Sequence, residues 1–188
     1  MNLLIEKAPD YLKVRGITIK IKTDFTLWVR FIIACENKNS EEIGKALLDI
    51  FGGVPQVKYK DDMIQAVMLW LYHGAGNKET GQQTKTNASA VFDFEVDGNV
   101  IYCELWQYFP HLMARGISYH EGVELIKLLL HNENTMLWHR GFARCGDFSS
   151  MSKEQKTFWQ KERAKYQLPV KNRLQNQQNI DDVMSRSF

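Results

Sequence analysis

The stretch Ile17-Thr-Ile-Lys-Ile-Lys-Thr-Asp-Phe-Thr-Leu-Trp-Val-Arg-Phe-Ile32 contains a change in the spacing of its apolar side chains. From Ile17 to Ile21, isoleucine alternates with polar residues, as in a strand that buries one face. From Phe25 onward, the spacing is the i, i+3, i+4, i+7 of an amphipathic helix, which Thr23 or Asp24 can cap. The stretch predicts a strand followed at once by a helix with an apolar stripe of Phe25, Trp28, Val29 and Ile32.

The segment before this strand completes a β-hairpin. Residues 11–14 are Tyr-Leu-Lys-Val, and Arg15-Gly16 is a turn signal between them and Ile17. A two-stranded hairpin is only marginally stable in water. We therefore expect a helix to pack on the face that carries Ile17, Ile19 and Ile21.

The rest of the chain shows helical spacing, interrupted by capping residues, glycine and proline. Residues 91–94 are expected to be extended, Asp97-Gly98 fits either a turn or a helix start, and Pro110 and Gly116 bracket a connection. The fold class predicted from these patterns is mainly α, with a small N-terminal β-hairpin and a compact helical domain of about six to seven helices. After the first helix, the helices are predicted at residues 40–51, 60–73, around 101–109, 118–130 with a capping box at Ser118 and Glu121, 135–144, and 153–168.

Length and composition are those of one globular domain. The chain has 188 residues, of which 44% are hydrophobic and 24% charged, which is enough for one sizeable core. The net charge of +2 is too small to indicate a nucleic-acid or membrane partner, and no apolar run is long enough to span a bilayer. We expect a single domain over residues 1–169, with a flexible polar loop at 77–89 and a flexible tail over 170–188.

The cysteines and the N-terminus favour a cytoplasmic protein. Cys35, Cys103 and Cys145 are odd in number and include no CxxC pair, so a zinc ribbon or a thioredoxin-type site is not supported. We expect them to be small buried or half-buried hydrophobic residues in a reducing compartment. The N-terminus lacks the basic segment and the long apolar run of a secretory signal.

Three patterns have part of the spacing of a known site, and each lacks a required residue. Gly76 and Gly81 have the spacing of a phosphate-binding loop, but Gln82-Gln83 follow instead of Lys and Ser or Thr, which favours a mobile linker. His120 and Glu124 lie one helical turn apart without the second histidine of a metalloprotease. The acids Asp93, Glu95 and Asp97 could bind a hard cation, although capping and turn roles explain them more simply. We predict no catalytic residue, no cofactor and no metal, and a protein that is not an enzyme.

The strongest charge asymmetry lies between Lys153 and Arg173, where seven basic residues stand against two acidic ones. Three interpretations remain open: an amphipathic helix that docks its aromatics on its own core, a helix that binds an acidic amphipathic partner, and a grip on single-stranded nucleic acid. The candidate partner-binding residues of this segment are Phe158, Trp159, Lys161, Arg163 and Tyr166.

Motifs along the chain resemble those of a small phage protein family. The N-terminal match is Val14-x-Gly16 followed by Ile21-x-Thr23-Asp24-Phe25-x-x-Trp28-x-Arg30-Phe31. The later matches, in the family's order, are Phe92-Asp93-Phe94-x-x-Asp97, Glu154-Gln155-Lys156-x-Phe158, and Tyr166-x-Leu168-Pro169. Arg144 falls where the family tends to have a basic residue, for which an ion pair is the expected role. The tail after Pro169 departs from the acidic C-terminus of some relatives.

The resemblance implies a function in phage assembly. The family is encoded among the tail-morphogenesis genes of long-tailed phages and prophages of Gram-positive bacteria, and its members are regarded as tail assembly chaperones. The implied partner is the tape-measure protein, a long and largely helical chain, and a frameshifted longer form of the chaperone or a homo-oligomer are further implied partners. The implied location is the host bacterial cytoplasm, with the protein absent from the finished virion. The competing class is a nucleic-acid-binding regulator that uses the basic last helix.

Overall fold

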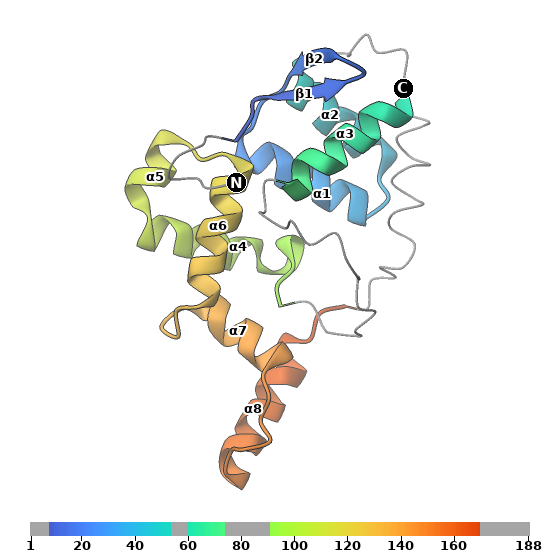
Figure 1. Cartoon of the computed structure of the whole chain (residues 1–188). Coiled ribbons are helices and arrows are strands. Elements are labelled where there is room, and N and C mark those ends of the chain that lie inside the picture. The colour runs from blue at the N-terminus through green and yellow to red at the C-terminus, as the bar shows by residue number, and fades with distance from the viewer. Residues whose placement is uncertain (1–7, 54–59, 74–90, 170–188) are drawn as a thin grey trace. The chain divides into compact units, whose positions relative to one another are not determined.

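The computed structural model describes residues 8–53, 60–73 and 91–169, and these group into two units (Figure 1). The first unit holds the described residues up to His73 together with residues 116–124, and the second holds residues 91–115 and 125–169. Each unit is described by itself below. The prediction of one domain over residues 1–169 stays a prediction, and the predicted loop at 77–89 and tail over 170–188 lie outside the described residues.

The first unit begins with the predicted hairpin, formed by β1 (Tyr11–Val14) and β2 (Ile17–Lys20). The two strands are antiparallel, with Leu12 opposite Ile19. Arg15 and Gly16 both have positive φ, at 47° and 83°, as a two-residue turn between right-twisted strands requires. The expected isoleucine face is only partly buried. Ile21 is buried and Ile19 half-buried, but Ile17 lies at the end of the hairpin and is 52% exposed.

Helix α1 (Phe25–Glu36) follows as predicted, and Asp24 caps it by accepting hydrogen bonds from the backbone N–H groups of Thr26 and Leu27. The predicted stripe is partly wrong, because Val29 and Ile32 are only half-buried and Phe31 takes the buried position instead. The buried side of α1 differs from the predicted one because the elements that pack on the helix, α2 (Ser40–Phe51) and the hairpin, decide which of its side chains are covered. The buried residues of α1 are Phe25, Trp28, Phe31, Ala34 and Cys35.

An aromatic cluster forms the centre of the first unit. Helix α3 (Lys60–His73) places Trp70 against Trp28 of α1, with the rings stacked at a centroid distance of 4.2 Å. Both indoles donate to backbone carbonyls at 2.8 Å, Trp28 to Lys22 and Trp70 to Pro9. These hydrogen bonds satisfy the indole N–H groups of the two buried rings, so neither donor is left unpaired in the interior.

The first turn of α6 (Tyr119–Leu130) closes this cluster with Tyr119 and His120. The imidazole of His120 is 1% exposed, and its Nε2 lies 2.9 Å from the carbonyl oxygen of Trp70. Its Nδ1 is buried without a hydrogen-bond partner. Burial lowers the pKa of His120 below its usual value of 6.5, against smaller raising effects of the Trp70 carbonyl and of Glu124. The ring therefore stays neutral at physiological pH.

This burial predicts a loss of stability in mild acid. In the unfolded chain His120 takes up a proton as pH falls through about 6.5, whereas the folded chain resists protonation until its lower pKa is reached. We expect the free energy of unfolding to fall as pH drops below about 6.5. Thermal unfolding between pH 7.5 and pH 5.5 measures how steeply stability falls with pH. This dependence should be weaker in His120→Gln and unchanged in the control His111→Gln, because His111 is exposed. An unchanged slope in His120→Gln would contradict the assignment.

The second unit is built from α4 (Phe94–Tyr108), α5 (Pro110–Arg115), the second half of α6, α7 (Met136–Cys145) and α8 (Lys153–Tyr166). Of the two structures considered for Asp97-Gly98, the helix start is correct, because Asp97 lies in the first turn of α4, whose capping residue is Asp93. One expectation is corrected, because the segment between Pro110 and Gly116 is a short helix. Proline suits the first position of a helix, since its missing N–H would have no partner there.

The starts of the last two helices agree with the predicted bounds. Thr135 caps α7, and Ser152 and Gln155 form a reciprocal capping box at the start of α8. Over the described ranges the chain has eight helices and one two-stranded hairpin, so the predicted fold class, mainly α with an N-terminal hairpin, is confirmed. Within these ranges no helix has both the length and the apolar character needed to cross a bilayer.

Candidate functional site

A buried ion network organises the second unit. Asp97 in the first turn of α4 is fully buried and accepts hydrogen bonds from two guanidinium groups of α7, those of Arg140 and Arg144. The donor–acceptor distances are 2.9 Å from Arg140 and 2.6 and 3.0 Å from Arg144. Burial by itself raises the pKa of Asp97, but the bonds from Arg144 and Arg140 outweigh it and hold the pKa below its usual range. The ion pair expected for Arg144 is therefore present.

Arg144 also connects three segments that are distant in sequence. Its Nε donates to the carbonyl of Tyr166 at the end of α8, at 2.7 Å, and its Nη1 donates to the carbonyl of Val91 before α4, at 3.1 Å. A single guanidinium thus holds the start of α4 and the end of α8 against α7. Its role is structural, because each of its three nitrogens donates to a group of its own chain.

The acidic residues at the start of α4 are used for capping and ion pairing. The Asp93 carboxylate accepts from the backbone N–H groups of Glu95 and Val96, and Asp97 faces the two arginines. Carboxylates already neutralised in this way are poor ligands for a hard cation, so the geometry does not favour the cation site considered for them. In the described ranges, no group of three or more His, Cys, Asp and Glu residues is arranged to hold a metal ion.

The five residues proposed as a partner surface do not lie together. Trp159 turns inward and packs between α7 and the segment after it. Its ring centroid lies 4.8 Å from that of Phe142 and 6.0 Å from that of Phe148. The aromatic stretch of α8 is thus partly the docking side of the helix, which was one of the three interpretations open from the sequence.

Arg163 and Tyr166 are likewise engaged within the unit. Arg163 donates to the carbonyls of Ala143 and Gly146, at 2.8 and 2.7 Å, and so satisfies carbonyl groups at the C-terminal end of α7. The Arg140 guanidinium lies 5.2 Å from the centroid of the Tyr166 ring, a cation–π arrangement. These contacts engage both half-buried side chains within the unit and help to hold α8 in place.

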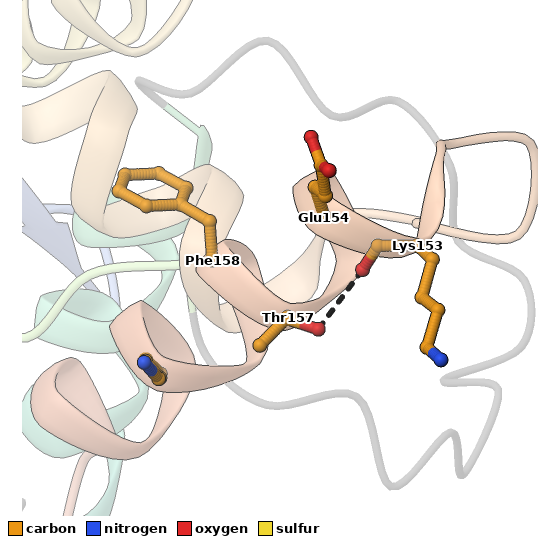
Figure 2. A pocket seen from close by; sticks show the side chains of 5 residues that line it. Lys153, Glu154, Thr157 and Phe158 are labelled. Atoms are coloured by element: carbon orange, nitrogen blue, oxygen red, sulfur yellow. Dashed lines mark hydrogen bonds between the residues drawn. The ribbon is translucent and has the colours of Figure 1, made fainter.

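Phe158 and Lys161 are the two candidates that face solvent. Phe158 is 51% exposed, and it lines a hollow of about 400 Å³ together with Lys161, Lys153, Glu154 and Thr157 (Figure 2). All five residues belong to α8, and the Thr157 hydroxyl donates to the Lys153 carbonyl at 2.9 Å, as the dashed line in Figure 2 marks. We call these five residues the α8 face. It combines one exposed aromatic ring with two lysines and one glutamate.

A polar contact next to Phe158 helps to set the orientation of the α8 face. The Nε2 of His139 in α7 lies 2.7 Å from the carboxylate of Glu162, and this hydrogen bond lowers the pKa of Glu162. Glu162 lies one helical turn from Phe158, and the ring centroid of His139 lies 6.4 Å from that of Phe158, so this contact fixes the side of α8 that carries Phe158. The packing of Trp159 fixes the same rotation.

Sequence reasoning missed a second surface, on α4. Tyr102 and Trp106 are 57% and 40% exposed, although their spacing suggested the apolar side of a buried helix. The side of α4 that is buried carries Asp97, Ile101, Glu104 and Leu105. The available signal was the seven-residue spacing of Asp97 and Glu104, which places both acids on one helix face. Arg140 and Arg144, one turn apart in α7, are the partners of Asp97, whereas Glu104 accepts from the backbone N–H groups of Met136 and Leu137.

The three cysteines differ from expectation. Cys35 is buried, and burial raises the pKa of its thiol to about 12, so it stays protonated and unreactive. Cys103 and Cys145 are exposed, which corrects the expectation that all three are buried or half-buried. In comparisons with known proteins, the chain matches no family model, no curated protein and no solved structure.

Proposed function

We propose that this chain is a phage tail assembly chaperone that binds the tape-measure protein through the α8 face. The observation that carries the proposal is an aromatic ring left exposed between lysines on a helix whose other side is firmly docked. It is supported by the resemblance of the motifs near Trp28, Phe94 and Phe158 to those of tail assembly chaperones. Under this proposal the protein acts in the host bacterial cytoplasm, is absent from the finished virion and catalyses no reaction.

The chemistry of the α8 face suits an amphipathic helical segment with acidic flanks. Phe158 offers an apolar anchor, and Lys153 and Lys161 lie on either side of it along the helix. A ring that is half-exposed in the free protein gains free energy when a partner covers it, and aromatic anchors dominate many interfaces. A long helical tail protein carries apolar stripes that would aggregate if left uncovered, which is the need that a chaperone meets.

Co-expression with the large helical protein encoded downstream tests the proposal. With the wild-type chain we expect copurification and a higher soluble yield of that partner. We expect the double variant Phe158→Ser with Lys161→Glu to weaken binding at least about tenfold, because it loses an interface anchor and a steering charge together. The matched control is Leu128→Ser on α6, an apolar side chain that is 58% exposed and lies outside the α8 face. Circular dichroism verifies that each variant is folded.

The proposal is wrong if the wild-type chain neither copurifies with that protein nor raises its soluble yield. It is also wrong in its choice of surface if Leu128→Ser weakens binding as much as the α8 variant does. The first outcome rules out this partner, and the second shows that recognition is not specific to the α8 face.

Binding of single-stranded nucleic acid is the alternative function for the same helix. The lysines of the α8 face could contact phosphates and Phe158 could stack on a base. This alternative has fewer groups than the sequence suggested, since Trp159, Arg163 and Tyr166 are engaged within the unit. It predicts an affinity for single strands that falls steeply with salt concentration, and the charge reversal Lys161→Glu should reduce that affinity.

A further inference from the structure

Residues 116–124 join the first unit from a distant part of the sequence, and we call them the docked segment. Two backbone hydrogen bonds hold its start beside the first turn of α1. The Phe25 N–H donates to the Ile117 carbonyl at 3.0 Å, and the Tyr119 N–H donates to the Thr23 carbonyl at 2.7 Å. Because these bonds join residues that are far apart in sequence, the segment is held in place by tertiary contacts.

The core of the first unit forms largely without the docked segment. Over the described residues, the buried members of its core cluster run from Leu12 in β1 to Trp70 in α3. To this cluster the docked segment adds Tyr119, half-buried at its edge, and Gly122 lies against the ring of Phe25. A segment that contributes little to a core can open at a lower free energy than the rest of the unit. The docked segment is thus the part of the first unit that we expect to open on its own.

The side chain of His120 anchors the docked segment to α3. Its Nε2 lies 2.9 Å from the Trp70 carbonyl oxygen, and its ring centroid lies 4.3 Å from that of Trp70. A carbonyl oxygen only accepts, so Nε2 carries the ring proton and Nδ1 carries a lone pair. Nδ1 is buried without a hydrogen-bond partner. A proton added there would place a positive charge and an unpaired N–H group in the interior.

The groups around the ring do not compensate such a charge. Glu124, one helical turn further along the docked segment, and the Trp70 carbonyl both favour the protonated ring. Burial outweighs them and lowers the pKa of His120. The other groups against the ring are the indole of Trp70 on α3 and the ring of Tyr119, which carry no counter-charge at neutral pH. Among the described residues, Glu124 is thus the charged group that acts on His120, and its effect is smaller than that of burial.

We propose that His120 is an acid-sensitive switch, whose protonation releases the docked segment from α1 and α3 while the core of the first unit stays folded. Release brings Nδ1 into water, where the imidazolium is hydrated, so protonation favours the released state over the docked one. Release also uncovers the rings of Phe25 and Trp70. The change is confined to one segment, which distinguishes it from a general loss of stability in acid, and it does not depend on the proposed function.

Hydrogen exchange of the full chain, corrected for the intrinsic rate at each pH, measures how often the docked segment opens. At pH 7.5 we expect its hydrogen-bonded amides, such as those of Tyr119 and Gly122, to open at a lower free energy than the buried amides of α2. Between pH 7.5 and pH 5.5 their opening constant should rise by up to about tenfold. This is the limit for a released imidazole with the usual pKa of 6.5 and a docked ring that stays neutral.

Two variants separate protonation of His120 from a general loosening of the docked segment. His120→Gln cannot take up a proton, so its opening constant should change by less than about twofold over the same pH range. Gly122→Ala is the matched control, because its clash with the Phe25 ring is the same at every pH. We expect it to raise the opening constant at both pH values and to keep the rise between them.

An NMR titration of the imidazole in the wild-type chain needs no variant. We expect the nitrogen chemical shifts of a ring protonated at Nε2 alone, and a titration midpoint well below 6.5. Three results would overturn the switch. The docked segment could open at the same free energy as α2, its opening constant in the wild type could change by less than about twofold between pH 7.5 and pH 5.5, or His120 could titrate at 6.5 or above.

Discussion

Replacing Asp97 by alanine is expected to lower the free energy of unfolding of the second unit by about 3–5 kcal/mol. The side chain of Arg144 is 1% exposed and that of Asp97 is fully buried, so the variant leaves a guanidinium without its counter-charge in the interior. A buried charge that loses its partner costs far more than an exposed pair contributes. Chemical denaturation followed by circular dichroism measures the loss, and hydrogen exchange in α4 and α7 locates it.

Two further variants distinguish the effect of an unpaired buried charge on stability from the effect of removing an acidic side chain. Glu133→Ala, at an exposed acid between α6 and α7, should change stability by no more than about 0.5 kcal/mol. The double variant Asp97→Leu with Arg144→Met should be more stable than Asp97→Ala, because the most buried guanidinium is removed as well. An Asp97→Ala variant as stable as Glu133→Ala would show that the network does not hold the second unit together.

Replacing Gly122 by alanine is expected to destabilise the first unit by about 1–3 kcal/mol, although alanine is the better helix former. A Cβ at Gly122 would lie 2.2 Å from Cδ2 of Phe25 and 2.5 Å from its Cε2. Phe25 cannot move aside easily, since it is 8% exposed and opens α1 beside the cap Asp24. The clash therefore outweighs the propensity gain of about 1 kcal/mol. Thermal or chemical unfolding gives the sign and the size of the effect.

Two other helical glycines provide matched controls. A Cβ at Gly44 in α2 or at Gly98 in α4 would meet no atom within 4 Å. Alanine at either position should stabilise the protein by about 0.5–1 kcal/mol. With Phe25→Ala in the background, Gly122→Ala should lose most of its cost, since the ring that it strikes is gone. If Gly122→Ala stabilises the wild-type chain as Gly44→Ala does, then α6 does not approach Phe25 as described.

The elements that sequence reasoning predicted well depend on local chemistry. Arg15-Gly16 closes the hairpin because two consecutive residues can adopt positive φ there. Asp24 and the pair Ser152 and Gln155 start their helices because each side chain reaches backbone N–H groups within three residues. Such interactions span a few positions of the chain, so the sequence around them is sufficient.

The errors arose where a distant partner chooses the buried side of a helix. Asp97-Gly98 fits either a turn or a helix start, and the N–H groups that Asp93 caps and the arginines of α7 decide for the helix. Tyr102 and Trp106 have the spacing of a buried stripe, yet Glu104 is directed inward to cap α7. In both cases a carboxylate with a strong buried partner decides the local structure, and in α4 it also leaves two aromatic rings exposed.

By itself, the sequence determined the approximate bounds of most elements, the mainly helical class and some of the capping residues, such as Asp24. Only the tertiary structure decided which rings are free to meet another molecule. It turned Trp159 and Tyr166 inward, left Phe158 exposed on α8, and exposed Tyr102 on α4. The physical reason is the sequence separation of the contacts that decide it. Arg144 bonds to Asp97 across 47 positions of the chain, and no local pattern encodes a contact between residues so far apart.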